Sequence, residues 1–140
     1  MYEYNVTVRF NDCDSMGHVN NTAYFTYFEE ARKDIFKLFN PALDIDAWNL
    51  IVASTQCDFV NEMNYAQKVS VYTWISRVGT SSFTVEHAIQ DDEGRWTARG
   101  KAVLAGYDFA ERKTVPISEP AASELALHQE GPENVPELRG

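Results

Sequence analysis

One short segment of the chain concentrates the side chains that could do chemistry. Residues 11–21 read Asn-Asp-Cys-Asp-Ser-Met-Gly-His-Val-Asn-Asn and hold two carboxylates, a thiol and an imidazole. The segment lies between a predicted strand and a predicted helix, and loops on a rigid scaffold often carry functional groups. The alternative is purely local, because Asp12 and Asp14 can each accept hydrogen bonds from their own turn backbone. Both interpretations are open at this point.

Three chemical interpretations fit the loop poorly. It matches three positions of an EF-hand calcium loop, but Met16 and Ala23 stand where ligands are required. Asp-x-Asp after a strand suggests aspartyl phosphoryl transfer, but no glycine-rich phosphate loop or suitable lysine accompanies it. Cys13 is a poor nucleophile, because acids on both sides raise the pKa of its thiol.

A fourth interpretation uses the helix that follows the loop. The unpaired N–H groups at the start of a helix carry partial positive charge and can polarise a carbonyl or stabilise an oxyanion. A carboxylate beside that carbonyl can attack it or activate a water molecule. This combination suits an activated acyl group such as a thioester.

The elements on either side of the loop are predicted from hydrophobic periodicity. Residues 4–10 alternate as a half-buried strand, with Val6, Val8 and Phe10 on its apolar face. Asn20 or Asn21 can cap a helix whose aromatic stripe predicts a single element over residues 21–39, about 28 Å long at 1.5 Å per residue.

The rest of the chain predicts an antiparallel sheet. Four strands are expected, over residues 51–59, 69–78, 82–90 and 96–107. A short helix is expected over residues 119–128, and residues 129–140 resemble a loose tail. The sequence therefore predicts one α+β domain over residues 1–128, with one sheet and one helix on its face.

Composition narrows the class of protein. The chain has 140 residues, 44% of them hydrophobic, which suffices for one well-buried core. Its net charge of −9 argues against nucleic-acid binding and against an anionic membrane surface. We find no apolar run long enough to span a bilayer and no signal peptide at the N-terminus. We therefore expect a cytoplasmic protein in which Cys13 and Cys57 are free thiols.

The loop also resembles a known family. Residues 8–21, followed by Tyr24 and Glu29-Glu30-Ala31-Arg32, closely resemble the hotdog-fold acyl-CoA thioesterases of the 4-hydroxybenzoyl-CoA thioesterase type. They are similar in particular to the members that carry Asp-x-x-Gly-His-Val-Asn-Asn. The likeness extends more weakly over most of the chain, including residues 78–83 and 113–117.

This resemblance implies a fold and an assembly. The fold is a five-stranded antiparallel sheet wrapped around a long central helix. Two protomers pair their sheets edge to edge, and the active site lies at the interface of this homodimer. Dimers of the family often associate further, so the resemblance is compatible with a homodimer or a homotetramer.

The resemblance also implies roles for individual residues. The catalytic acid falls on Asp14, as nucleophile or general base, and the N–H that polarises the thioester carbonyl falls on Asn21. His18 is the third residue assigned to the catalytic loop. Substrate contacts are implied at Gly17, Val19, Asn20, Tyr24, Asn64, Tyr65, Ser81 and Ser82. The family needs no metal or redox cofactor, because coenzyme A is part of the substrate.

Two features leave the substrate open. Residues 62–66 (Glu-Met-Asn-Tyr-Ala) stand where many relatives have a proline, in a region that lines the acyl pocket from the partner subunit. The chain is acidic although coenzyme A carries phosphates. The basic residues that could contact them are Arg99, Lys101, Arg112 and Lys113. The expectation is hydrolysis of a fatty or aromatic acyl-CoA to the free acid and coenzyme A.

Other functions on the same fold are also considered. Thioesters of an acyl carrier protein are an alternative substrate, and a non-catalytic module that binds acyl thioesters is an alternative function. A hydratase or dehydratase is disfavoured, because Glu29 and Glu30 have no histidine beside them on the helix.

Overall fold

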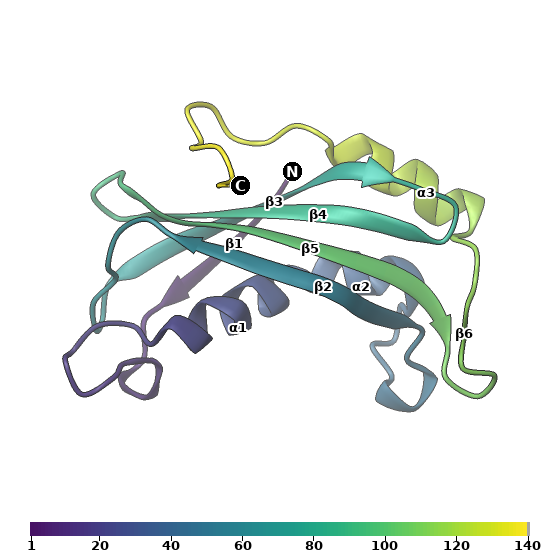
Figure 1. Cartoon of the computed structure of the whole chain (residues 1–140), viewed down its shortest axis with the longest axis horizontal. Coiled ribbons are helices and arrows are strands. Elements are labelled where there is room, and N and C mark those ends of the chain that lie inside the picture. Colours follow the sequence, from purple (N-terminus) through teal and green to yellow (C-terminus); the bar gives the residue numbers. More distant parts are fainter. Residues whose placement is uncertain (140) are drawn as a thin grey trace.

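The computed structural model describes residues 1–139 and is built on one curved antiparallel sheet with helices beneath one of its faces (Figure 1). The strands are β1 (Tyr2–Thr7), β2 (Leu50–Phe59), β3 (Lys68–Val78), β4 (Ser82–Asp91), β5 (Trp96–Asp108) and β6 (Lys113–Thr114). The α-helices are α1 (Asn21–Ala31), α2 (Lys33–Phe39) and α3 (Glu119–Leu125). Short 3-10 helices are η1 (Phe10–Asp12), η2 (Ile45–Ala47) and η3 (Ala126–His128).

The five long strands are arranged in the order β1-β3-β4-β5-β2. Each neighbouring pair is antiparallel, and the two-residue β6 pairs with the end of β5. The first two strands of the sequence therefore lie at opposite edges of the sheet. The strands β2 to β5 were predicted to within two residues at each end, because their alternating side chains face the helices on one side and the outer surface on the other, whereas the two-residue β6 was not predicted.

The first strand is shorter than predicted. It ends at Thr7, and Phe10, expected on the apolar face, is 76% exposed in η1. The cause is a local turn, in which Asp12 accepts a hydrogen bond from the Arg9 backbone N–H at 3.0 Å. Val8 is the last residue that keeps the predicted inward position, and it is buried.

The single long helix predicted over residues 21–39 is wrong. The helix is divided at Arg32, whose φ and ψ of −86° and 2° are not helical. Its N–H bonds the carbonyls of Glu29 and Glu30, instead of the carbonyl four residues back. The Arg32 side chain is buried, with Nη1 3.1 Å from Nε2 of His87 on the sheet. The apolar stripe nevertheless continues from α1 into α2, where Ile35 is fully buried.

The face of the sheet that packs against α1 approaches the helix closely at Gly100. A Cβ at Gly100 on β5 would stand 2.5 Å from the Phe28 ring, so only glycine allows this close approach. Phe28 in turn stacks on His87, with ring centroids 4.7 Å apart. His87 is fully buried, and burial together with the nearby arginines holds its pKa well below the usual value. It is a neutral core histidine whose Nδ1 lies 2.9 Å from Thr73 Oγ1.

The opposite face of the sheet is covered by α3 and the C-terminal segment (Figure 1). Residues 129–139 form neither helix nor strand, yet they are tied to the sheet. The Arg99 Nε–H donates to the carbonyl of Pro136, and the Arg139 N–H donates to Asp58 Oδ2 at 2.7 Å. Arg99 is therefore buried beneath the segment, where it also pairs with Glu86 at 2.7 Å, and it is not a free cation for a ligand phosphate.

Candidate active site

Asp12 anchors the loop to the domain. It is only 5% exposed and accepts hydrogen bonds from Arg9 Nη2 at 3.0 Å and from the Tyr27 hydroxyl at 2.8 Å. Burial opposes its ionisation, but the bonds from the side chain and backbone of Arg9 and from Tyr27 prevail and hold its pKa below the usual value. Because both of its oxygens are engaged by these groups, Asp12 is a structural carboxylate and offers nothing to a cation or a substrate.

Asp14 is the exposed acid of the loop. Its N–H donates to the carbonyl of His18 at 2.8 Å, and its own carbonyl accepts from Gly17, so the chain turns back on itself between them. The turn needs a left-handed residue, and Gly17 has a φ of +83°. Within residues 1–139 the carboxylate accepts a hydrogen bond only from the Met16 N–H, at 2.9 Å. Asp14 is thus held in place by the backbone while its carboxylate faces outward.

The start of α1 supplies the electrophilic partner. Asn20 is the N-cap residue, and its side chain accepts from the Thr22 N–H at 3.1 Å. The Asn20 N–H donates to the carbonyl of Asp12, which joins the anchored loop to the helix. Asn21 is the first helical residue, and its N–H has no hydrogen-bond acceptor in the described chain. An N–H in this position is available to a carbonyl oxygen of a substrate.

The loop is fastened to the chain that follows β2. The Val19 N–H donates to the carbonyl of Met63 at 2.9 Å, and His18 forms a β-bridge with Asn64. The resemblance assigned His18 to the catalytic loop. Its Nε2 lies 3.1 Å from Glu62 Oε2, so it contacts an acid that the sequence did not single out for this role.

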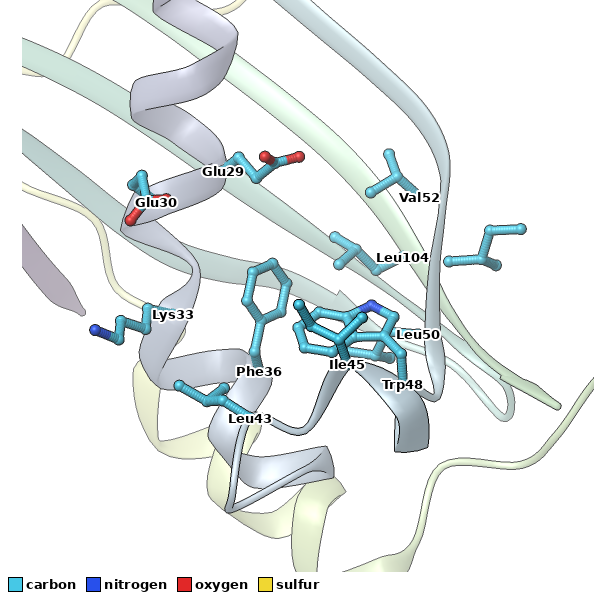
Figure 2. A pocket seen from close by; sticks show the side chains of 11 residues that line it. Glu29, Glu30, Lys33, Phe36, Leu43, Ile45, Trp48, Leu50, Val52 and Leu104 are labelled. Atoms are coloured by element: carbon cyan, nitrogen blue, oxygen red, sulfur yellow. The ribbon is translucent and has the colours of Figure 1, made fainter. Parts of the chain in front are cut away.

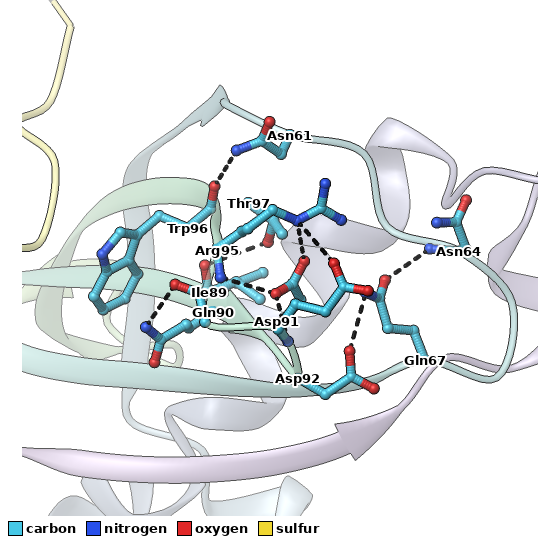
Figure 3. Close-up of polar contacts among 12 residues, drawn as sticks. Asn61, Asn64, Gln67, Ile89, Gln90, Asp91, Asp92, Arg95, Trp96 and Thr97 are labelled. Atoms are coloured by element: carbon cyan, nitrogen blue, oxygen red, sulfur yellow. Dashed lines mark hydrogen bonds and ion pairs between the residues drawn. The ribbon is translucent and has the colours of Figure 1, made fainter.

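A cavity of about 490 Å³ opens beside the first turn of α1. Its lining comprises Tyr24, Phe59, Val60, Asn61, Glu62, Asn64 and Arg95. Figure 3 shows the polar contacts behind two of these residues, where Arg95 Nε donates to Asp91 at 2.9 Å and the Gln67 side chain accepts from the Asn64 N–H and donates to Asp92. Predicted contacts Tyr24 and Asn64 therefore lie together here, while Tyr65 packs outside against Phe10.

Ser81 and Ser82 lie away from this cluster. Ser82 pairs with Ala105, which is opposite the first residues of β2, whereas the loop approaches the last residues of β2. In Figure 1 the turn between β3 and β4 and the loop before α1 are at opposite ends of the sheet. Within a single protomer, these two serines are therefore far from Asp14.

A second cavity, of about 570 Å³, lies between the helices and β2 (Figure 2). It is lined by Glu29, Glu30, Lys33, Phe36, Leu43, Ile45, Trp48, Leu50, Ile51, Val52 and Leu104. Its floor is apolar, with the rings of Phe36 and Trp48 5.2 Å apart, and its charged groups come from the exposed side of α1 and α2. The sequence did not reveal this cavity, because its walls come from distant segments that each look like ordinary core or linker.

The cysteines offer no nucleophile. Burial, with Asp12 and Asp14 nearby, raises the pKa of the Cys13 thiol, as the sequence predicted. Burial raises the pKa of Cys57 to about 12. Neither thiol forms a disulfide within residues 1–139.

Two searches of the described residues concern other kinds of site. Between Met1 and Arg139, no three side chains of His, Cys, Asp or Glu are grouped so that they could hold a metal ion. In the same range, no helix has the length and apolar character needed to cross a membrane.

Comparison with known proteins agrees with this geometry. Residues 8–125 match the profile of the thioesterase-like superfamily. An uncharacterized Bacillus subtilis protein, YsmA, is 35% identical over 99 residues, which cover 71% of this chain and 67% of that protein.

Solved structures give the same result. A predicted thioesterase from Bacillus stearothermophilus is 34% identical, with a TM-score of 0.89 over 94% of this chain and 98% of that one. A Thermus thermophilus thioesterase, whose structure contains coenzyme A and zinc, is 26% identical, with a TM-score of 0.79 over 91% and 93% of the two chains. The curved antiparallel sheet is thus of the thioesterase hotdog type, and the chain belongs to the thioesterase-like superfamily.

Proposed function

We propose that this protein hydrolyses acyl-CoA thioesters to the free acid and coenzyme A. The observation that carries the proposal is the pairing of an outward-facing Asp14 carboxylate with the unengaged Asn21 N–H at the start of α1. The thioester carbonyl would accept a hydrogen bond from Asn21, which stabilises the negative charge that develops on its oxygen. Asp14 would then attack the carbonyl carbon or remove a proton from an attacking water. This scheme uses no metal and no redox cofactor.

The proposed enzyme is a homodimer joined at β2. This edge strand is bonded to β5 on one side only, and four consecutive residues at its centre, 52–55, are exposed. An edge strand of ten residues with an exposed centre is a template for pairing with another strand. Pairing with a second copy about a two-fold axis is antiparallel, and it places the Leu50 end of one β2 beside the Phe59 end of the other.

Such a dimer would also complete the active site. The Phe59 end carries the loop and the start of α1, while the Leu50 end carries the second cavity and the turn at Ser81 and Ser82. The carboxylate of one protomer would therefore face the apolar cavity of its partner. A cavity of about 570 Å³ with an aromatic floor suits a medium-chain or aromatic acyl group. A homotetramer would be a pair of these dimers.

The direct test of the function is release of free thiol from a panel of acyl-CoAs. Short, medium and long aliphatic groups and aromatic groups are compared at equal concentration, and the corresponding acyl-carrier-protein thioesters form a second series. We expect the highest kcat/KM with medium-chain or aromatic acyl-CoA. If thiol is released only from the carrier-protein thioesters, the substrate is an acyl carrier protein thioester and not an acyl-CoA. Tight binding without release from either series would instead indicate a binding module.

A complementation experiment tests the shared site. Glu29→Trp puts a bulky side chain into the second cavity from an exposed position on α1, and Asp14→Asn removes the acid, so each homodimer is expected to be impaired. The two chains are co-expressed with different affinity tags, and the mixed dimer is purified through both. If the site is shared, one of its two sites carries neither change and the mixed dimer regains about half of the wild-type rate. If each site lies within one protomer, the mixed dimer gains nothing.

A further inference from the structure

One contact between the loop and the chain after β2 joins an imidazole to a carboxylate and has no part in the chemistry proposed above. His18 Nε2 and Glu62 Oε2 are 3.1 Å apart, with side chains that are 36% and 70% exposed. An exposed pair of this kind contributes little to folding stability. The contact lies next to the candidate active site, because Glu62 also lines the cavity beside the first turn of α1.

His18 is connected to Asp14 by a backbone hydrogen bond. The carbonyl of His18 accepts the Asp14 N–H at 2.8 Å, so a displacement of His18 is passed to the backbone of the acid. The other side of the turn, at Met16 and Gly17, is exposed and bonds only to Asp14 itself within the described chain. Beyond the anchor at Asp12, the turn that carries Asp14 is therefore held from the side of the chain after β2.

That side has three ties. Two of them, the Val19–Met63 hydrogen bond and the bridge to Asn64, use the backbone and form with any side chains. The third is the contact between the Glu62 carboxylate and His18 Nε2, 3.1 Å apart, and it depends on these two side chains. It is the only one of the three that a substitution at position 62 removes.

We propose that Glu62 is a positioning residue of the enzyme. By binding His18 Nε2 it holds the loop so that the Asp14 carboxylate stays beside the start of α1. This role depends on the proposed thioester hydrolysis, and it is specific to the side chain at position 62. A displacement of a reacting group by about 1 Å is enough to lower turnover on the order of a hundredfold.

The first test compares Glu62→Ala with Glu62→Gln. The alanine variant is expected to lower kcat about 10- to 100-fold, with a smaller change in KM, since the reacting group moves and only one of the side chains that line the cavity is removed. Glutamine keeps an oxygen at the same distance from His18 Nε2, so Glu62→Gln is expected to retain most of the wild-type kcat. The matched control is Glu124→Ala, which removes the exposed carboxylate of the Glu124–His128 pair on the far face of the sheet and is expected to leave kcat unchanged.

A double-variant cycle shows whether Glu62 acts through His18. In the His18→Ala background, Glu62→Ala is expected to cause no further loss of kcat, because the connection is already broken. Independent losses that multiply in the double variant would overturn the proposal. So would a Glu62→Ala enzyme with wild-type kcat.

Amide hydrogen exchange separates a failure of this inference from a failure of the proposed function. Faster exchange at residues 14–20 in Glu62→Ala, but not in Glu124→Ala, supports the tie whether or not a substrate has been found. If the wild type hydrolyses no thioester, the proposed function fails, and hydrogen exchange alone then shows whether Glu62 holds the loop. If the wild type is active and both kcat and exchange are unchanged in Glu62→Ala, the positioning role is wrong.

Discussion

Asp14→Asn is expected to lower the rate of thiol release from the best acyl-CoA by at least about a thousandfold, while the protein stays folded. The amide is nearly the same shape as the carboxylate and still accepts the hydrogen bond from the Met16 N–H, so the loop keeps its form. It can neither attack a carbonyl nor take a proton from water. The change therefore removes the reactive group without removing the structure that carries it.

The measurement is kcat and KM on wild type and variant, with circular dichroism and thermal unfolding as checks of the fold. Asp92→Asn is the matched control, because Asp92 is an exposed acid that bonds Gln67 at 3.3 Å on the turn between β4 and β5. This control is expected to keep the wild-type rate. An Asp14→Asn enzyme with even a tenth of the wild-type kcat would exclude Asp14 as nucleophile or base.

Gly100→Ala is expected to destabilise the domain by about 1–3 kcal/mol or more, the usual cost of overpacking a core. The new methyl group would stand 2.5, 2.7 and 2.9 Å from three atoms of the Phe28 ring. That ring cannot easily move aside, because it is fully buried and stacked on His87. His87 is itself held between Thr73 and Arg32. For a chain of this length, each kcal/mol lowers the unfolding midpoint by several degrees.

Denaturant unfolding of Gly100→Ala, Phe28→Leu and the double variant measures this effect. Leucine removes part of the ring that the methyl group would strike, so the double variant is expected to be more stable than the sum of the two single losses allows. Strict additivity, or an unchanged midpoint in Gly100→Ala, would show that α1 can shift away from the sheet at little cost.

The sheet could be predicted from the sequence because its pattern is local. Alternation over ten residues identifies a strand wherever the strand pairs, and the bounds of β2 to β5 were predicted to within two residues. The break between α1 and α2 is different, because it accompanies a contact between Arg32 and His87, which are 55 positions apart. Hydrophobic periodicity continues across Arg32 and gives no sign of the break.

The same distinction separates the residues of the candidate site. The exposed Asp14 and the cap at Asn20 lie within one continuous motif, and the sequence placed both beside the helix start. The partner of His18 lies 44 residues away at Glu62, in the segment that was noted only as a departure from the usual family pattern. Ser81 and Ser82 were predicted as contacts from the resemblance, and one chain places them at the other end of the sheet.

The strand order has a consequence for synthesis of the protein on the ribosome. β2 is the second strand to be synthesised, but its partner within the described chain is β5. Leu50 therefore stays unpaired until Gly106 has been made. At about 5–20 residues per second, the intervening chain takes about 3–11 s to be synthesised. During that interval β2 is open along both edges, and unpaired edges invite association with other nascent chains. A message truncated before the codon for Gly106 yields a peptide in which this strand can never be fully paired, so such fragments are expected to aggregate or be degraded.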